Sequence, residues 1–218
     1  MIKVENVYFK YKSNKTNILE GLNFSVNDGE IIAIVGENGS GKSTIGRLIS
    51  GILKLKSGSI KIDDIDVNKN YNLIKDKIGI VFQNPENQII FNNIYDELSF
   101  SLKGLEKSEI NARIDWALKQ VGMYEFKYTI ICITNLADEI LLADKTLILD
   151  NGKIVHEIAK EDLINKAYLL DKFSIRQPTL LKILTELKKN GIDLNAKDFS
   201  ISELIEILKV KIKNDKFD

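Results

Sequence analysis

The chain has 218 residues, of which 44% are apolar and 28% charged, with 31 basic and 31 acidic side chains. This composition is typical of a folded globular protein and excludes a disordered or collagen-like polymer. Because the net charge is zero, the chain lacks the basic excess of a general nucleic-acid-binding protein, so we expect no nucleic-acid partner.

The sequence also limits the cellular compartment. No apolar run approaches the roughly 18–20 residues that a membrane-spanning helix needs, and the first residues lack the apolar core of a secretion signal. Cys132 is the only cysteine, so no internal disulfide can form, and no Cys/His cluster has metal-ligand spacing. We therefore expect a reducing cytosolic environment.

The first part of the chain predicts strands and one helix. Residues 2–11 and 18–26 are rich in β-branched and aromatic side chains, which favour strands. The apolar runs at 31–35 and 78–82 are typical of strands that are buried on both faces. Between them, the segment 43–53 predicts a helix.

A second helix is predicted after Ser108, which is a suitable N-cap. Gly122 is expected to end this helix. Trp116 lies in it, and we interpret Trp116 as a packing residue. The apolar face of this helix consists of Ile110, Ile114, Ala117 and Val121.

Further along the chain, residues 129–133 form a third apolar run that predicts a buried strand, followed by a short helix from about Leu136. The segments 146–149 and 153–155 flank Asn151-Gly152. Asn-Gly between two apolar runs is a strong indication of a β-hairpin.

The C-terminal part is helical in character. Pro178 precedes a stripe of leucines that ends near Gly191, and Ser200–Glu203 has the pattern of a capping box at the start of a last helix. Strands mixed with helices, followed by helices alone, predict an α/β core with a helical C-terminal extension.

The most specific motif is a glycine-rich loop between the predicted strand 31–35 and the helix after it. It matches G-x-x-x-x-G-K-[ST] at every specified position, with residues Gly36, Glu37, Asn38, Gly39, Ser40, Gly41, Lys42 and Ser43, followed by Thr44. Such a loop cradles phosphate oxygens with backbone N–H groups, while the lysine supplies charge and the hydroxyl can ligate Mg²⁺. A chance glycine-rich turn is the alternative, and the strand before the loop and the helix after it argue against it.

With this loop, nearly the whole chain resembles an ATP-binding cassette (ABC) ATPase. The resemblance implies a P-loop NTPase core of mixed α/β structure, with an antiparallel β part and a helical C-terminal extension. We place the nucleotide-binding core at residues 1–157 and the extension at 158–218.

The resemblance also assigns roles outside the loop. Tyr11, in Phe9-Lys10-Tyr11, resembles the family's aromatic residue that stacks on adenine; an edge-strand aromatic packed on the core is the alternative. Gln83 resembles the Q-loop glutamine, which together with Ser43 would contact Mg²⁺. ATP and Mg²⁺ are therefore the expected ligands.

Two segments indicate which group of ABC ATPases the chain resembles. The run Val81–Gln88, with the Asn-Gly-Ser-Gly-Lys-Ser-Thr form of the phosphate loop, is similar to the first of the two paralogous ATPases of energy-coupling factor (ECF) transporters. That group implies several partners: a second ABC ATPase in a heterodimer, a transmembrane coupling subunit and a substrate-binding membrane subunit. It also implies a peripheral location on the cytoplasmic face of the cell membrane.

One departure from the family is large. After Phe126 the family continues into its signature sequence, the Walker B strand with its Asp-Glu pair, and the D-loop, but here Tyr128 leads directly to Thr129. Some tens of residues are missing, including the strand that would separate strands 78–82 and 129–133, so we expect an incomplete core sheet. Asn135 stands at the position of the family's switch histidine.

These departures bear on function. The resemblance implies an ATPase subunit that couples ATP binding and hydrolysis to the uptake of a vitamin or metal ion, but the missing carboxylates predict deficient hydrolysis. We interpret Asp138-Glu139 as an acidic pair on a helix surface and not as a replacement for the Walker B pair. Two alternatives remain: a nucleotide-binding module without catalysis, or a non-functional truncated gene product.

Overall fold

The computed structural model describes residues 1–81, 94–102, 104–120, 129–134 and 137–191, together with 204, 205 and 209. The chain divides into two compact units. The first combines residues 1–76 with 128–218, and the second spans residues 77–127.

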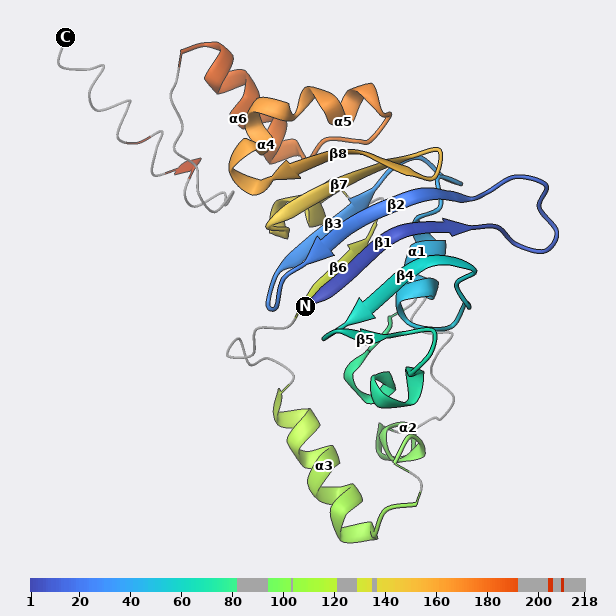
Figure 1. Ribbon diagram of the computed structural model, residues 1–218. Helices are drawn as coiled ribbons and strands as arrows, with labels where there is room; N and C mark the ends of the chain where they lie inside the picture. The colour runs from blue at the N-terminus through green and yellow to red at the C-terminus, as the bar shows by residue number, and fades with distance from the viewer. Residues whose placement is uncertain are drawn as a thin grey trace. The chain divides into compact units, whose positions relative to one another are not determined.

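An antiparallel sheet of the first unit has the strand order β2-β1-β4-β5 (Figure 1). Its strands are β1 (Ile2–Phe9), β2 (Leu19–Val26), β4 (Ser57–Ile62) and β5 (Ile65–Asp66). Buried side chains alternate with outer ones at Val7 and Phe9 of β1 and from Leu22 to Val26 of β2, and a register shift between Val4 and Val7 interrupts the alternation. The strands predicted at 2–11 and 18–26 are confirmed, although β1 ends at Phe9.

A second sheet has the order β6-β3-β7-β8. It contains β3 (Ile31–Val35), β6 (Ile130–Ile133), β7 (Lys145–Asp150) and β8 (Lys153–Ala159). β3 runs parallel to both β6 and β7, whereas β8 pairs antiparallel with β7. Four of the five β3 residues are buried, which confirms the strand predicted at 31–35.

The β7–β8 hairpin is also confirmed. Asn151 and Gly152 form its turn, with φ angles of 44° and 77°. Both angles are positive, as a type I′ turn requires, and the Asn-Gly pair adopts such angles at low cost.

β6 is less buried than the sequence predicts. Ile130 is 40% exposed and the other three residues of β6 are half-buried. Within the described residues β6 has a neighbour on one side only, since the sheet ends there. The prediction of a strand is confirmed, but the prediction that it is buried is wrong because no described strand covers its second edge.

The strand predicted at 78–82 is not formed over the part that is described. Residues 78–81 belong to no helix or strand, and Val81 is 80% exposed; Phe82 lies outside the described residues. Strand conformation depends on hydrogen bonds to a neighbouring strand. An apolar run without such a neighbour does not become a strand.

Helix α1 (Lys42–Ile49) follows β3 and is shorter than the predicted helix 43–53. It ends at Ser50, and Gly51 follows with a φ of 73°. Its inner face, which includes Ile45 and Leu48, is buried. Two short 3₁₀ helices, Tyr71–Leu73 and Lys75–Lys77, follow β5.

The helical extension packs on the second sheet (Figure 1). After the 3₁₀ segments Ala137–Leu142 and Lys160–Asp162 come α4 (Leu163–Lys166), α5 (Tyr168–Lys172) and α6 (Thr179–Lys189). One apolar cluster joins side chains of both parts, among them Val35, Ile148, Ile158, Leu163, Leu170 and Leu181. The domain boundary at 157/158 stays a prediction.

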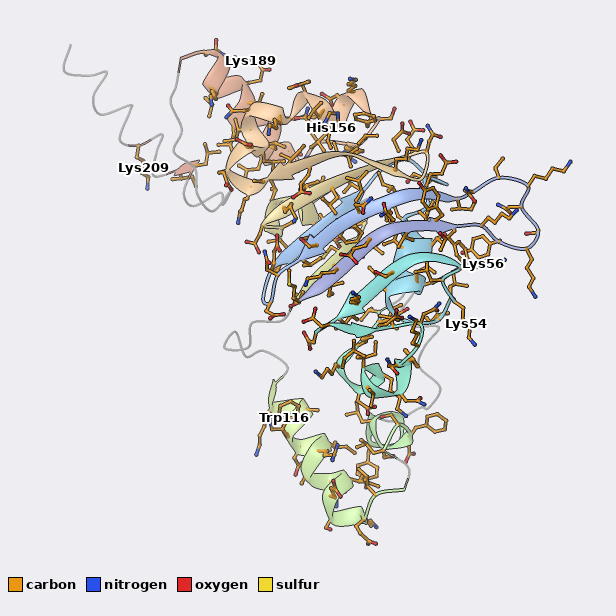
Figure 2. The ribbon with its side chains drawn as sticks, in the orientation of Figure 1. Lys54, Lys56, Trp116, His156, Lys189 and Lys209 are labelled. Atoms are coloured by element: carbon orange, nitrogen blue, oxygen red, sulfur yellow. The ribbon has the colours of Figure 1, made fainter. Side chains whose placement is uncertain are left out.

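The first long helix of the extension agrees with the sequence. α6 begins after Pro178 and buries Leu181 and Leu184, as predicted. His156 (Figure 2), on β8, is half-buried, and its ring makes an edge contact with that of Phe173 of the extension, at 5.4 Å between centroids. The predicted last helix lies mostly outside the described residues.

The second unit contains α2 (Ile94–Phe100) and α3 (Lys107–Gln120). The predicted apolar face of α3 is confirmed at Ile114, which is 5% exposed. Two predictions are wrong. α3 begins one residue before Ser108, so Ser108 lies within the helix, and Trp116 on α3 is 57% exposed (Figure 2). No helix among the described residues is both long and apolar enough to cross a membrane.

One isoleucine from each of β3 and β6 tests the difference in burial between the two strands. Ile32 is fully buried, whereas Ile130, on the neighbouring strand, is 40% exposed. We expect Ile32→Ala to lower the free energy of unfolding by about 2–5 kcal/mol, because it leaves a cavity. We expect Ile130→Ala to cost about 1 kcal/mol or less. Urea unfolding measures both, and equal losses would show that β6 is covered as completely as β3.

Candidate functional site

The glycine-rich loop connects the carboxyl end of β3 to the start of α1. The Ser40 N–H donates to the Glu37 carbonyl at 3.2 Å, and the Gly41 carbonyl accepts the first helical bonds, from Thr44 and Ile45. No described side chain caps the helix at Gly41. The first N–H groups of a helix carry partial positive charge, so this uncapped start is suited to an anion.

Lys42 is the central charge of the loop. Its Nζ donates to the carbonyl of Gly36 at 2.7 Å and to that of Glu37 at 2.8 Å. Lys42 is only 8% exposed, and burial lowers the pKa of its ammonium group. An ammonium that is held by neutral carbonyls still favours an anionic partner, because a nearby negative charge offsets its loss of hydration.

The hydroxyls of the loop differ in their surroundings. Ser40 Oγ is buried and has no hydrogen-bond partner among the described residues. A buried hydroxyl without a partner is costly, and a phosphate oxygen in the loop would satisfy it. Ser43 is exposed, so its hydroxyl can reach a bound ion. The residues present therefore fit a phosphate group and its metal ion.

Gly36 permits the loop to begin close to β7. A Cβ at Gly36 would lie 2.1 Å from the carbonyl oxygen of Leu149, which is far shorter than any real contact. Only glycine fits at this position. The close approach follows from the parallel pairing of β3 and β7, in which Val35 lies opposite Ile148.

The structure brings Tyr11 to the loop. Its hydroxyl lies 3.2 Å from Oγ1 of Thr44, in the first turn of α1. Its half-buried ring also makes an edge contact with Phe9, at 5.0 Å between centroids. Tyr11 thus lies beside the loop and also packs against the end of β1, so its role toward adenine stays a prediction.

The other predicted site residues are not placed. Gln83 and Asn135 lie outside the described residues. Asp138 and Glu139 lie in the 3₁₀ segment Ala137–Leu142, and Asp138 is exposed. No group of three or more His, Cys, Asp or Glu residues suited to a metal ion occurs in the part of the chain that the structure describes.

Glu139 is half-buried in the 3₁₀ segment Ala137–Leu142, and its negative charge acts on Cys132 of β6. Burial and the negative charge of Glu139 together raise the pKa of the Cys132 thiol. Cys132 is paired with Ala33, three residues before the loop begins at Gly36. The interpretation of Asp138-Glu139 as a surface pair that is separate from the phosphate loop stays a prediction.

Sequence reasoning missed the residues that support the loop from outside the motif. Ser40 accepts a hydrogen bond from the Gly152 N–H at 3.1 Å, and Gly152 belongs to the hairpin turn. The Asn-Gly pair predicts the turn but carries no information on what the turn contacts. A side-chain pattern cannot reveal a bond between two backbone groups.

Comparison with known proteins identifies the family. The family model described as ABC transporter matches residues 19–151, which include the whole phosphate loop. The chain belongs to the ABC transporter family. The matched region also includes the segment after Tyr128, where the sequence departs from the family pattern.

Two curated relatives resemble the chain over nearly its full length. Both are named energy-coupling factor transporter ATP-binding protein EcfA1. The protein from Ligilactobacillus salivarius is 33% identical, over 98% of this chain and 98% of its own length. The protein from Streptococcus agalactiae serotype Ia is 31% identical, over 95% of this chain and 96% of its own length.

A solved structure shows the same fold. It is described as cbiO1 from Clostridium perfringens, part of the ABC transporter complex cbiONQ. It superposes with a TM-score of 0.65 at 25% identity, over 84% of this chain and 98% of the other. The α/β P-loop NTPase fold of ABC type is therefore confirmed.

The length of the first alignment supports the internal gap. The alignment with the L. salivarius protein extends over 275 positions, whereas this chain has 218 residues. At least 57 aligned positions (275 less 218) therefore lack a residue of this chain. This agrees with the expectation that some tens of family residues are missing.

The geometry of Lys42 leads to a binding prediction. We expect Mg-ATP to raise the melting temperature of the wild-type chain, because a ligand that binds only the folded state stabilises it. Lys42→Ala should abolish this shift, since it removes the buried charge of the loop. Lys54, exposed in the connection between α1 and β4 (Figure 2), provides the control. Equal shifts for Lys42→Ala and Lys54→Ala would contradict the assignment of the site.

Tyr11 leads to a second prediction. Tyr11→Ala should weaken ATP binding by roughly 1–2 kcal/mol if the ring stacks on adenine. Tyr11→Phe removes only the hydroxyl near Thr44 and should cost less. Calorimetric titration with ATP and with inorganic tripolyphosphate, which has no base, separates the roles. An equal loss of affinity for both ligands would assign Tyr11 to packing of the loop.

Proposed function

We propose that this chain is the ATP-binding subunit of an energy-coupling factor ABC transporter. The observation that carries the proposal is the phosphate loop, in which a buried ammonium and an unpartnered buried hydroxyl meet at an uncapped helix start. The names of the two EcfA1 relatives support the transporter assignment.

ATP with Mg²⁺ is the proposed ligand. Residues Gly36 to Thr44 would hold the phosphates, with Lys42 as the counter-charge, and Tyr11 would contact the adenine. Ser43 and Gln83 would hold the metal ion, which supplies charge neutralisation between the phosphates when it is bound. The described residues of the loop would bind and orient the phosphates, and none of them is proposed to act as a general base.

The proposed partners are those that the resemblance to ECF ATPases implies. One ABC ATPase would pair with this chain as a heterodimer, and two membrane subunits would provide coupling and substrate binding. The solved relative is described as part of a complex, cbiONQ, which supports an assembly of this kind. The chain would then lie at the cytoplasmic face of the membrane as a peripheral protein.

We further propose that this chain is deficient in hydrolysis. Phosphoryl transfer to water needs a positioned nucleophile and stabilised charge, which the family's missing carboxylates would provide. We interpret Asp138-Glu139, of which Asp138 is exposed, as a surface pair and not as a replacement for those carboxylates. Asn135, at the switch position, can hydrogen-bond but cannot take a proton at neutral pH.

A second candidate function is a nucleotide-binding module without catalysis within the same complex. The edge of β6 that has no neighbour among the described strands, and the missing aligned positions, favour it. A non-functional truncated gene product is the third. It predicts no cooperative unfolding, because the loss of a central strand exposes backbone groups of its neighbour.

Steady-state phosphate release tests the proposal on turnover. We expect the purified chain to bind Mg-ATP but to release negligible phosphate, since a missing general base alone typically costs about 10²–10⁴ in rate. Turnover of roughly 1 s⁻¹ or more, typical of working enzymes, that disappears in Lys42→Ala would contradict the proposed deficiency. Asp138→Asn and Glu139→Gln would then show which carboxylate supports it.

A further inference from the structure

The hairpin turn at Asn151-Gly152 contacts the phosphate loop through backbone groups. The Gly152 N–H donates to the Ser40 carbonyl at 3.1 Å, and the Gly152 carbonyl accepts from the Glu20 N–H at 3.0 Å. Gly152 therefore connects the loop on one side with the start of β2 on the other. Both bonds are made by the same residue, so a displacement of Gly152 affects both.

Only glycine fits at position 152. Its φ of 77° is in the left-handed region, which disfavours other residues. In addition, a Cβ there would lie 2.3 Å from the carbonyl oxygen of Ile18 and 3.1 Å from Cα of Leu19. Both atoms belong to the backbone, so neither can move aside as the end of a side chain would.

The contact involves Ser40, which is part of the proposed phosphate-binding loop. Ser40, whose carbonyl accepts from Gly152, is also the residue with the buried, unpartnered hydroxyl. At the other end of the loop, Gly36 lies against the Leu149 carbonyl of the same hairpin. The β7–β8 hairpin thus touches the loop at both ends through backbone atoms.

We infer that Gly152 is a positioning residue for the phosphate loop: its N–H fixes the Ser40 peptide, and its missing side chain lets the turn approach the loop and β2 together. Nucleotide affinity then depends on a residue outside the loop motif. This inference rests on the proposed function of the loop as an ATP site.

A matched pair of glycines tests the inference. Gly152→Ala introduces both the φ penalty and the collision with Ile18. Gly191→Ala introduces nearly the same φ penalty, since Gly191 has a φ of 78°, but no described atom lies within 4 Å of its Cβ position. The difference between the two variants therefore reports the contact.

Dissociation constants should be measured by calorimetry well below each variant's melting temperature, with Mg-ATP and with inorganic tripolyphosphate. We expect Gly152→Ala to weaken both ligands by about tenfold or more, because the displaced Ser40 peptide no longer meets the phosphates. Gly191→Ala should leave both constants unchanged. A purely structural role would lower only the melting temperature, so an unchanged dissociation constant for folded Gly152→Ala would overturn the inference.

Hydrogen exchange in the wild-type chain gives a second test that does not depend on the folding of a variant. The Gly152 and Glu20 amides are bonded to the loop and to the turn, and neither belongs to the loop. We expect tripolyphosphate to slow their exchange together with that of the loop amides, because ordering the loop stabilises the bonds behind it. Protection of the loop amides alone would overturn the inference.

The same measurements separate the two proposals. If wild-type protein binds neither ATP nor tripolyphosphate, the proposed function fails. If it binds both and Gly152→Ala binds them equally well, the function stands and the positioning role of Gly152 fails.

Discussion

The parallel pairing of β3 with β7 and β6 is the constraint on which the rest of the site depends. It places the end of β3, and so the start of the phosphate loop, beside the Leu149 carbonyl. From there the loop turns into α1, and Lys42 is held by the carbonyls of Gly36 and Glu37. The charged group is in position because the strand before it is buried and paired on both sides.

The same sheet has no described strand at the second edge of β6, whose first edge pairs with β3. β6 is partly exposed and residues 78–81 form no strand, and among the described residues neither has a strand at the edge where it would need one. The residues proposed to bind phosphate follow β3 and begin α1, both of which the structure describes in full. The carboxylates that the family resemblance implies are proposed to belong to the missing segment.

Local patterns in the sequence predict most of the elements but not their surroundings. The loop motif predicts the strand–loop–helix unit, and Asn151-Gly152 predicts the hairpin, because glycine, asparagine and lysine have specific local requirements there. The apolar runs at 78–82 and 129–133 mislead, since periodicity reports what a segment could bury and not whether a neighbour is present. The interpretation of Trp116 as a packing residue is wrong for the same reason, since an aromatic side chain in a helix could be buried but has no described neighbour that buries it. The contact between Gly152 and Ser40 could not be predicted, because it joins two backbone groups 112 residues apart.

We propose that an intact phosphate loop remains in a chain that lacks the carboxylates needed to hydrolyse its ligand. The most direct test is to mix excess protein with γ-labelled Mg-ATP, incubate for hours, separate the bound nucleotide and identify it. We expect the nucleotide to be recovered on the protein, with its γ-phosphate attached. Recovery as ADP and free phosphate would contradict the claim of deficient hydrolysis. Failure to retain any nucleotide at protein concentrations that saturate other ABC ATPases would contradict the claim that the loop is intact.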